Sequence, residues 1–445
     1  MKKICVVLVL VLILCNIAGC SGQSQTGEPA TTKNVKQDTS SEKKNITGTI
    51  SVSMGDRYLQ EAAQKFEKLH PGVKVEFKEL KTENGVTSEL YEQLINRMNT
   101  EIMSGKGADI IVLLPWMPYK KYISRQILVD LNQMMKSDQN YAPSQYYTNI
   151  FAGVKYNNKI YTLPVSYSYN LLGSDTKLNV DDRQWNWQDL AKTIERTAGN
   201  DWRYALQFSD EGLLRTIIRH DYSRFVNDKK KSASFNSQEF ISLLNLCKNL
   251  SDKGYIRKSV EKPTHDESKT LFKDIMVSSL LDLAWTQTPL DPDISAKYLY
   301  RYPSQSRENG TFQTGTMYAI NSASPNQNTA WEFLKFLISE DMQSSSALYG
   351  FPVNKSAYKQ IVANQSNQFR KDKQISLSEE QKDTLMQKYA HFNEEIVQDL
   401  KIYSEPDPRI IEFIAKEAHP FFAGQSSAEN VAQKIQNKVE FYLHE

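Results

Sequence analysis

The chain has 445 residues, which is too many for one small hydrophobic core and fits two lobes. Its 54 lysines and arginines nearly balance its 52 aspartates and glutamates, so the formal net charge is only +2. Binding along nucleic acid requires a basic excess that neutralises phosphates, and this balance therefore argues against a nucleic-acid partner.

The N-terminus has the pattern of an export signal that ends in a lipid-attachment site. Two lysines precede an apolar run over residues 4–14, which is shorter than the ~20 residues of a membrane-spanning helix. Residues 17–20, Ile-Ala-Gly-Cys, resemble the bacterial lipobox, in which cleavage before the cysteine leaves its thiol to be joined to diacylglycerol. An ordinary secretory signal with a chance cysteine is the alternative. We predict a lipoprotein signal peptide over residues 1–19 and lipidation at Cys20, which places the protein on the extracytoplasmic face of the cell membrane.

Residues 20–45 are predicted to form the lipidated cysteine and a disordered linker. After Cys20 this stretch is rich in Ser, Thr, Gln and Lys, and Val35 is its only apolar residue larger than alanine. Such a composition cannot bury enough apolar surface to offset the entropy of ordering. Beyond the linker, Cys247 has no cysteine partner, and its apolar surroundings in the sequence predict a core thiol.

Hydrophobic periodicity predicts an open α/β sheet at the start of the folded part. Alternating or continuous apolar residues predict strands near 50–54, 73–77 and 110–114, and helical spacing predicts helices over 59–69 and 90–102. Ligands of such sheets lie beyond the carboxyl ends of the strands. Residues 55–58 and 115–119 occupy those ends in this chain.

The remaining elements are predicted more coarsely. Residues 157–163 indicate a turn and a strand, and residues 328–340 indicate a strong helix. Residues 185–260 and 268–284 are predicted to be mainly helical, with a short strand near 205–208. A capping box formed by Ser426 and Glu429 is predicted to open the last helix.

Four sequence blocks together resemble one protein family. They are residues 107–111 (Gly-Ala-Asp-Ile-Ile), residues 156–164 (Tyr-Asn-Asn-Lys-Ile-Tyr-Thr-Leu-Pro), residues 319–326 (Ala-Ile-Asn-Ser-Ala-Ser-Pro-Asn) with residues 330–337 (Ala-Trp-Glu-Phe-Leu-Lys-Phe-Leu), and residues 350–355 (Gly-Phe-Pro-Val-Asn-Lys). In this order and spacing they resemble the extracellular solute-binding proteins of ABC importers, especially the sugar-binding group that includes maltose-binding protein.

The resemblance implies a two-lobed, periplasmic-binding-protein-like α/β fold of type II, with hinge-linked lobes and interleaved chain crossings. The implied lobes are 46–165 plus 317–349 for the N-terminal lobe and 166–315 plus 350–445 for the C-terminal lobe. The chain would cross between them near residues 165–167, 315–317 and 349–351. The implied mechanism is hinge closure around a ligand in the cleft between the lobes.

Several candidate ligand-binding residues lie at the ends of the predicted strands. Trp116 and Tyr119 follow the third strand in a proline-flanked loop, where aromatic rings suit the apolar face of a sugar, although they could instead anchor the loop. Asp56 and Arg57 follow the first strand. The resemblance implies contacts of these two residues with sugar hydroxyls, whereas a helix cap is the structural alternative for Asp56.

Further candidates lie just after the first crossing and within the implied C-terminal lobe. Tyr167, Tyr169 and Asn170 are expected to flank the cleft, although strand alternation would instead bury every second tyrosine. Trp285 resembles a tryptophan of the family that faces the ligand. Trp187 and Trp331 are expected to be structural.

The function that the resemblance implies is capture of a carbohydrate, with an oligosaccharide favoured, and its delivery to the permease subunits of an ABC importer. The protein is expected to be a monomer without cofactor or metal. We do not expect an enzyme, because the histidines form no metal-binding pair and the chain lacks a G-x-S-x-G elbow and a phosphate loop. A peptide, polyamine or metal-chelate ligand, or a sensor role toward a membrane kinase, stays open as an alternative.

Overall fold

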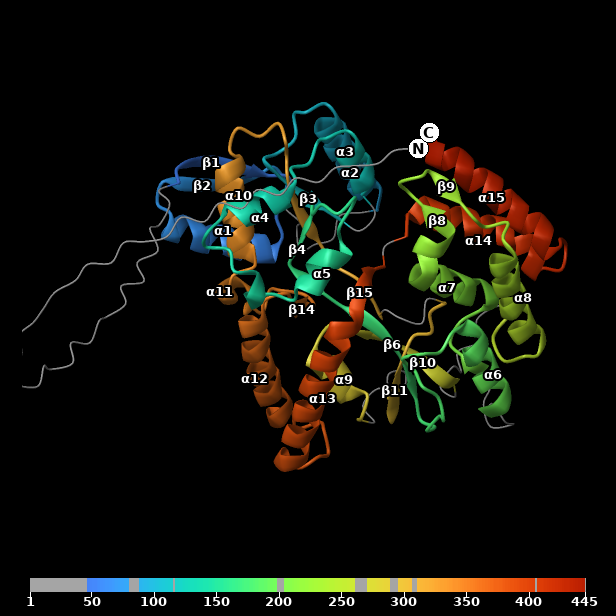
Figure 1. Ribbon diagram of the computed structural model, residues 1–445. Coiled ribbons are helices and arrows are strands. Elements are labelled where there is room, and N and C mark those ends of the chain that lie inside the picture. Colours follow the sequence, from blue (N-terminus) through green and yellow to red (C-terminus); the bar gives the residue numbers. More distant parts are fainter. Residues whose placement is uncertain are drawn as a thin grey trace, which may run out of the picture. The chain divides into compact units, whose positions relative to one another are not determined.

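The computed structural model describes residues 46–79, 88–114, 117–197, 204–260, 270–288, 295–305, 310–404 and 406–444 (Figure 1). All of these residues belong to one compact unit. The predicted signal peptide, Cys20 and the linker lie outside the described residues. Within the described ranges, no helix combines the length and the apolar character that crossing a membrane would require.

The first sheet has five strands in the order β2-β1-β3-β13-β4. Strand β1 runs parallel to β2 and β3, and β13 runs antiparallel to β3 and β4. Helices α1 (Arg57–Leu69) and α2 (Ser88–Met103) connect the three parallel strands, as predicted from periodicity. The strands are β1 (Gly48–Val52), β2 (Val73–Phe77), β3 (Ile110–Leu113), β4 (Leu163–Pro164) and β13 (Met317–Ile320).

Asp109 links two of the family-like blocks at the start of β3. Its carboxylate accepts hydrogen bonds from Ser51 N (2.7 Å), Ser324 Oγ (2.5 Å) and Asn326 Nδ2 (3.4 Å). Burial by itself would raise the pKa of Asp109, but these hydrogen bonds outweigh it, and the pKa lies below its usual value. The blocks at 107–111 and 319–326 therefore meet in the structure, where they stabilise the start of the central strand β3.

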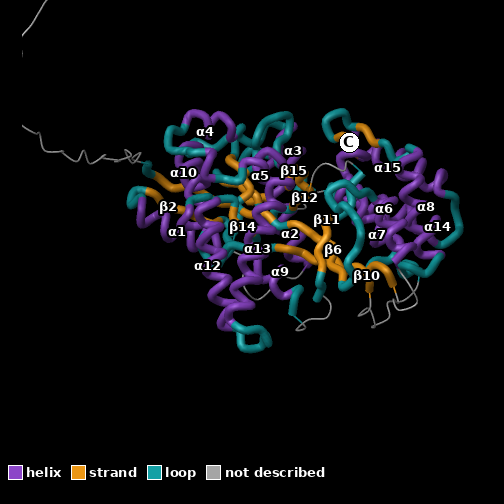
Figure 2. The backbone as a smooth tube through the Cα atoms, turned by 60° about the horizontal axis from the view of Figure 1, so that its bottom comes forward, coloured by secondary structure: helices purple, strands orange, loops and turns teal. Residues whose placement is uncertain are grey.

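The second sheet corrects one sequence prediction. Its strand order is β11-β6-β10-β7, and β10 occupies residues that were predicted to be mainly helical. Within the described residues 270–284, only α9 (Leu280–Trp285) is helical. The strand pairs antiparallel with β6 and parallel with β7. The strands are β6 (Tyr169–Ser174), β7 (Tyr204–Leu206), β10 (Thr270–Val277) and β11 (Tyr298–Arg301). Figure 2 shows β6, β10 and β11 grouped together.

A group of helices packs into a separate core beside this sheet (Figure 1). Its members are α6 (Trp187–Thr197), α7 (Asp210–Phe225), α8 (Gln238–Asp252), α14 (Pro408–Phe422) and α15 (Ala428–His444). Cys247 on α8 is fully buried here as a free thiol, as predicted, and burial raises its pKa. The predicted cap of the last helix was one residue too early, because Ser427 rather than Ser426 accepts from Asn430 N (3.2 Å) at the start of α15.

The helices α12 (Lys355–Lys371) and α13 (Glu379–Asp399) run side by side and contribute to the core of the first sheet (Figure 1). Trp331 of α10 (Gln327–Leu337) is buried in this core, as predicted, and donates to Asp138 (2.9 Å). The remaining elements are α3 (Tyr119–Ser124), α4 (Leu131–Ser137), a 3-10 turn (Pro143–Gln145), α5 (Thr148–Gly153), α11 (Glu340–Gln343), β5 (Ser166–Tyr167), β8 (Val226–Asn227), β9 (Ser232–Ala233), β12 (Gly310–Phe312), β14 (Phe351–Pro352) and β15 (Leu400–Tyr403).

Segments at the three expected crossings lie side by side. Strand β5 pairs antiparallel with β14, and Ser168 exchanges two backbone hydrogen bonds with Gln313 (2.9 and 2.8 Å). Gly350, directly before β14, has a φ of +94°, and a Cβ at this position would lie 3.0 Å from the carbonyl oxygen of Tyr167. A glycine is therefore required where the chain passes close to β5.

Candidate functional site

A cleft of about 430 Å³ is lined by four separate segments of the chain. Tyr119 and Lys120 belong to α3, and residues 153–156 lie at and after the end of α5. The other lining residues come from 219–229, at the end of α7 and around β8, and from 401–403 in β15. This volume lies in the range of about 300–1,000 Å³ that is usual for small-molecule sites. We call this concavity the cleft.

Four tyrosines line the cleft, and their rings border it. Burial raises the pKa of Tyr156, so its hydroxyl stays protonated at neutral pH and can donate a hydrogen bond, whereas the Tyr222 hydroxyl, whose pKa is also raised, is itself buried. Tyr222 is only 8% exposed. The four residues are Tyr119, Tyr156, Tyr222 and Tyr403.

The charged side chains of the cleft are predominantly basic. Lys120 forms an ion pair with Asp228, and its ammonium lies 5.7 Å from the ring centroid of Tyr222. The other basic residues have no carboxylate within ion-pair distance among the parts of the chain that the structure describes. They are Lys155, Arg219, Lys229 and Lys401.

His220 contributes a neutral, polar surface to the same wall. Its Nδ1 lies 2.7 Å from Thr311 Oγ1, and its ring stacks on Tyr302 with centroids 4.4 Å apart. Burial lowers the pKa of His220 to about 3, so the imidazole carries no charge at neutral pH. His220 also lines a second, smaller cavity of about 30 Å³.

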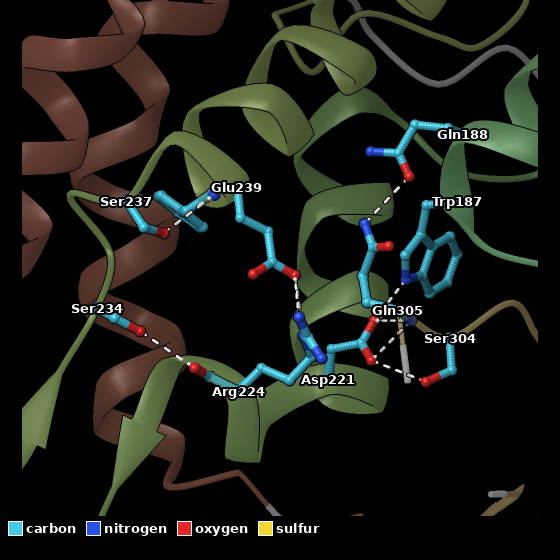
Figure 3. Close-up of polar contacts among 10 residues, drawn as sticks. Trp187, Gln188, Asp221, Arg224, Ser234, Ser237, Glu239, Ser304 and Gln305 are labelled. Atoms are coloured by element: carbon cyan, nitrogen blue, oxygen red, sulfur yellow. Dashed lines mark hydrogen bonds and ion pairs between the residues drawn. The ribbon is translucent and has the colours of Figure 1, made fainter. Parts of the chain in front are cut away.

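A buried carboxylate holds the α7 wall of the cleft in place (Figure 3). Helix α7 departs from helical geometry at Asp221, between His220 and Tyr222. The Asp221 carboxylate accepts hydrogen bonds from Trp187 Nε1 (2.6 Å) and Ser304 Oγ (2.9 Å). Burial raises its pKa, and the hydrogen bonds offset only part of that effect. Trp187 is therefore structural, as predicted, because it fixes the turn that carries the cleft residues.

A second contact supports the next turn of the same helix. Arg224 pairs with Glu239 of α8, with Nε 2.9 Å and a terminal guanidinium nitrogen 2.8 Å from the same carboxylate oxygen (Figure 3). The polar contacts at Asp221 and Arg224 thus attach the last turn of α7, which carries Tyr222 and Ser223, to its neighbours. The cleft wall is built on a fixed element, as a binding site requires.

The structure places two predicted residues at the start of α1. Asp56 is the N-cap of this helix and its Oδ1 accepts from Leu59 N (2.9 Å), which is the structural alternative considered for this residue. Arg57 is exposed, and neither residue lines the cleft. Tyr119 does line the cleft. Trp116 lies outside the described residues.

Tyr167 and Tyr169 are both buried in an aromatic cluster. Their rings stack on Phe351 at centroid distances of 5.4 and 5.9 Å, and their exposed fractions are 0% and 2%. The Tyr169 hydroxyl also donates to Asn393 Oδ1 (2.8 Å). Tyr167 therefore has no surface available to a ligand in this structure, whereas Tyr169 borders the smaller cavity.

Asn170 and Trp285 lie away from the cleft lining. Asn170 also borders the smaller cavity, where its side chain bonds Asp274 Oδ1 (2.9 Å) and Gln313 Nε2 (3.2 Å). Trp285 ends α9 and packs, partly buried, against the core of the first sheet. Of the described candidates, Tyr119 is thus the one that borders the cleft.

Sequence reasoning missed most of the cleft residues. Arg219 lies on an amphipathic helix, where an exposed basic residue is ordinary, and Lys229 belongs to a charged turn that resembles solvated surface. Lys120 could have been found from the sequence, because it directly follows the predicted residue Tyr119. Nothing in the sequence around Lys155 or Lys401 indicates a binding site, since only the fold brings these two residues to the cleft.

Comparisons with known proteins agree with this architecture. A sequence profile of the bacterial extracellular solute-binding proteins matches residues 52–344. Three solved structures illustrate the similarity. The sugar-binding protein MalE from the phytopathogen Xanthomonas citri is 16% identical, with 89% of this chain and 98% of that chain covered and a TM-score of 0.62. A periplasmic oligogalacturonide binding protein from Yersinia enterocolitica is 13% identical, with 89% and 99% covered and a TM-score of 0.62, and an ABC substrate-binding protein from Listeria monocytogenes in complex with cycloalternan is 14% identical, with 90% and 100% covered and a TM-score of 0.56.

These similarities extend over nearly the whole folded part and over nearly the full length of the related chains. The expected α/β fold, two-lobed and of the periplasmic-binding type, is therefore confirmed. The family profile covers well over half of the chain, which exceeds what one shared motif would produce. The chain belongs to the bacterial extracellular solute-binding protein family.

Proposed function

We propose that this protein captures a carbohydrate in the cleft and delivers it to an ABC importer. The observation that carries the proposal is the lining of the cleft, where four tyrosines accompany polar and charged side chains. A pyranose has an apolar face that an aromatic ring can cover and hydroxyls that require donors and acceptors. The structural relatives in Listeria and Yersinia are described as binding cycloalternan and oligogalacturonide, which supports a sugar ligand for this chain.

We further propose that ligand binding closes the two lobes. The lobe boundaries at 46–165 plus 317–349 and 166–315 plus 350–445 remain a proposal. The side-by-side arrangement of the segments around Tyr167, Gln313 and Phe351 supports a hinge at these crossings. The ion pair between Lys120 of α3 and Asp228 after β8 already joins two walls of the cleft. A ligand that contacts both walls would favour the closed state and present it to the permease.

The tether at Cys20 rests on the sequence pattern of residues 1–20. A lipidated protein would stay at the membrane that holds the permease, so that captured ligand travels only a short distance. Cys20→Ser should abolish the incorporation of a labelled fatty acid into the protein. A variant that still incorporates the label would contradict the proposed anchor.

A saccharide panel tests the binding function directly. A matching oligosaccharide should raise the melting temperature by mass action and change the tryptophan fluorescence. Tyr119→Ala should weaken the binding, whereas Tyr298→Ala, which removes an exposed tyrosine of β11 outside the cleft lining, should leave the affinity unchanged. No response to any saccharide, together with a clear response to a peptide, polyamine or metal chelate, would refute the carbohydrate proposal.

A second experiment distinguishes a role in import from a role as a sensor. Deletion of the protein should abolish uptake of the labelled ligand if it serves an importer. Uptake that continues unchanged, with loss of a transcriptional response to the ligand, would instead favour the sensor role. A binding role without catalysis predicts that the ligand is recovered chemically intact after release from the protein.

A further inference from the structure

The cleft combines a strong local charge with an overall chain that is nearly neutral. Its lining contains five basic side chains and one carboxylate, a surplus of four positive charges, whereas the whole chain carries a formal net charge of only +2. His220 adds no charge, because burial lowers its pKa to about 3. Like charges gathered around a concavity focus the positive potential there and attract anions.

Most of this charge is available to a ligand. Lys155, Arg219, Lys229 and Lys401 are exposed. Within the described residues they have no ion pair, in contrast to Lys335, which pairs with Asp138 at 2.7 Å and with Glu332 at 2.8 Å. An arginine and several lysines without internal carboxylates can bind carboxylate or sulfate groups, and the guanidinium can do so with two parallel hydrogen bonds.

The ion pair between Lys120 and Asp228 shows that the cleft already accommodates a carboxylate. The two side chains are 31% and 24% exposed, so the pair lies partly shielded from water, with the Lys120 ammonium over the ring of Tyr222. A carboxylate of a ligand could take the place of Asp228 against this ammonium. The exchange would replace one charge-assisted contact of Lys120 by another and would require Asp228 to turn toward water.

We propose that the cleft binds an anionic oligosaccharide, in which pyranose rings carry carboxylate or sulfate groups. Tyrosine rings would contact the sugar faces, and Arg219, Lys401 and their basic neighbours would bind the anionic groups. This inference rests on the proposed carbohydrate-binding function and specifies its ligand class.

Calorimetry on the full chain with three probes of equal length tests the inference. The probes are trigalacturonate, a sulfated trisaccharide and neutral maltotriose. At least one anionic probe should bind more than about tenfold more tightly than the neutral one, since a hydrogen bond to a charged group is worth about tenfold or more in affinity. The affinity of that probe should also fall as salt rises from about 0.05 to 0.3 M, because ions screen exposed charges.

Charge-removing variants connect the effect to the cleft. Arg219→Gln and Lys401→Gln should each weaken binding of the anionic probe by about tenfold and leave binding of the neutral probe nearly unchanged. Lys373→Gln is the matched control, because Lys373 is also exposed but lies outside the cleft lining. Melting temperatures equal to that of the unsubstituted protein would show that each variant is folded.

The outcomes separate this inference from the proposed function. Tightest binding of trigalacturonate supports a carboxylate ligand, and tightest binding of the sulfated probe supports a sulfate ligand of the same anionic class. Neutral maltotriose binding as tightly as both anionic probes, without a salt effect, would overturn the anionic inference and leave the carbohydrate function standing. Absence of binding to every saccharide in a broad panel would overturn the carbohydrate function itself.

Discussion

Gln343 connects chain segments that are far apart in the sequence, and its substitution should be strongly destabilising. The residue ends α11 and is fully buried. Its Nε2 donates to the carbonyl oxygens of Val165 (2.9 Å) and Leu337 (3.0 Å), and its Oε1 accepts from Val353 N (2.8 Å). Val165 and Val353 flank β5 and β14, so one amide joins both segments beside the proposed hinge.

Gln343→Leu keeps nearly the same side-chain volume but removes every one of these hydrogen bonds. Leu337 O still accepts from the Tyr58 hydroxyl (2.6 Å), whereas Val165 C=O and Val353 N–H lose the amide partner in a buried environment. Each such group costs about 1–3 kcal/mol, and we expect a loss of about 4 kcal/mol in the free energy of unfolding.

Equilibrium unfolding in urea, followed by circular dichroism, measures this loss. The matched control is Gln374→Leu, at an exposed position between α12 and α13, which should change the free energy of unfolding by less than about 0.5 kcal/mol. A loss below about 1 kcal/mol for Gln343→Leu would refute the reasoning, since it would mean that the two backbone groups find other partners.

Three further predictions follow from other contacts. Asp221→Ala should destabilise the protein by about 3 kcal/mol, measured in urea, because it leaves Trp187 Nε1 and neighbouring donors buried without their acceptor; an unchanged stability would contradict this. The pKa values of Asp109 and Asp138 are lowered by folding, so their contribution to stability is present above the usual carboxyl pKa near 3.8 and is lost as the pH falls below it. Unfolding curves should therefore show a steep loss of stability below about pH 4, and Asn at both positions should flatten it; an equally steep loss in that double variant would argue against these carboxylates. Gly350→Ala should lower the free energy of unfolding by about 2 kcal/mol, since alanine is strained at this φ and its Cβ would crowd β5, and a neutral result in thermal melts would exclude that strain.

The first sheet was predictable because its residues follow simple periodicities. Strand β3 is buried at every position, and β1 and β2 alternate. Strand β10 was missed for a physical reason. Lys273 lies in the middle of this strand with a side chain only 5% exposed, paired with Asp175 (3.8 Å) and bonded to Ser295 O (2.5 Å). A lysine in a sequence normally indicates solvated surface. Lys273 therefore interrupts the apolar run of the strand, and the pattern that results resembles that of a helix.

The candidate site was predicted less well than the fold. Tyr119 was found because it follows a strand of the sheet, which is a rule of the fold. Tyr167 and Tyr169 fit both a cleft and a core equally well, and only their stacking on Phe351, which is distant in the sequence, decides between the two. Arg219 and Lys401 are ordinary surface residues by local pattern. Their proximity depends on how α7 and β15 are placed, which no short-range signal encodes.

The rate at which the buried thiol of Cys247 reacts with a reagent can report local opening of the protein. It lies on α8 within the core that α7, α14 and α15 complete, and it is the free cysteine of the described residues. A thiol reagent can reach the sulfur only when these helices separate, so the labelling rate reports the opening of that core separately from the core of the first sheet. Since α7 also carries a wall of the cleft, any slowing of the labelling by a bound ligand would measure how far binding at the wall stabilises the helices behind it.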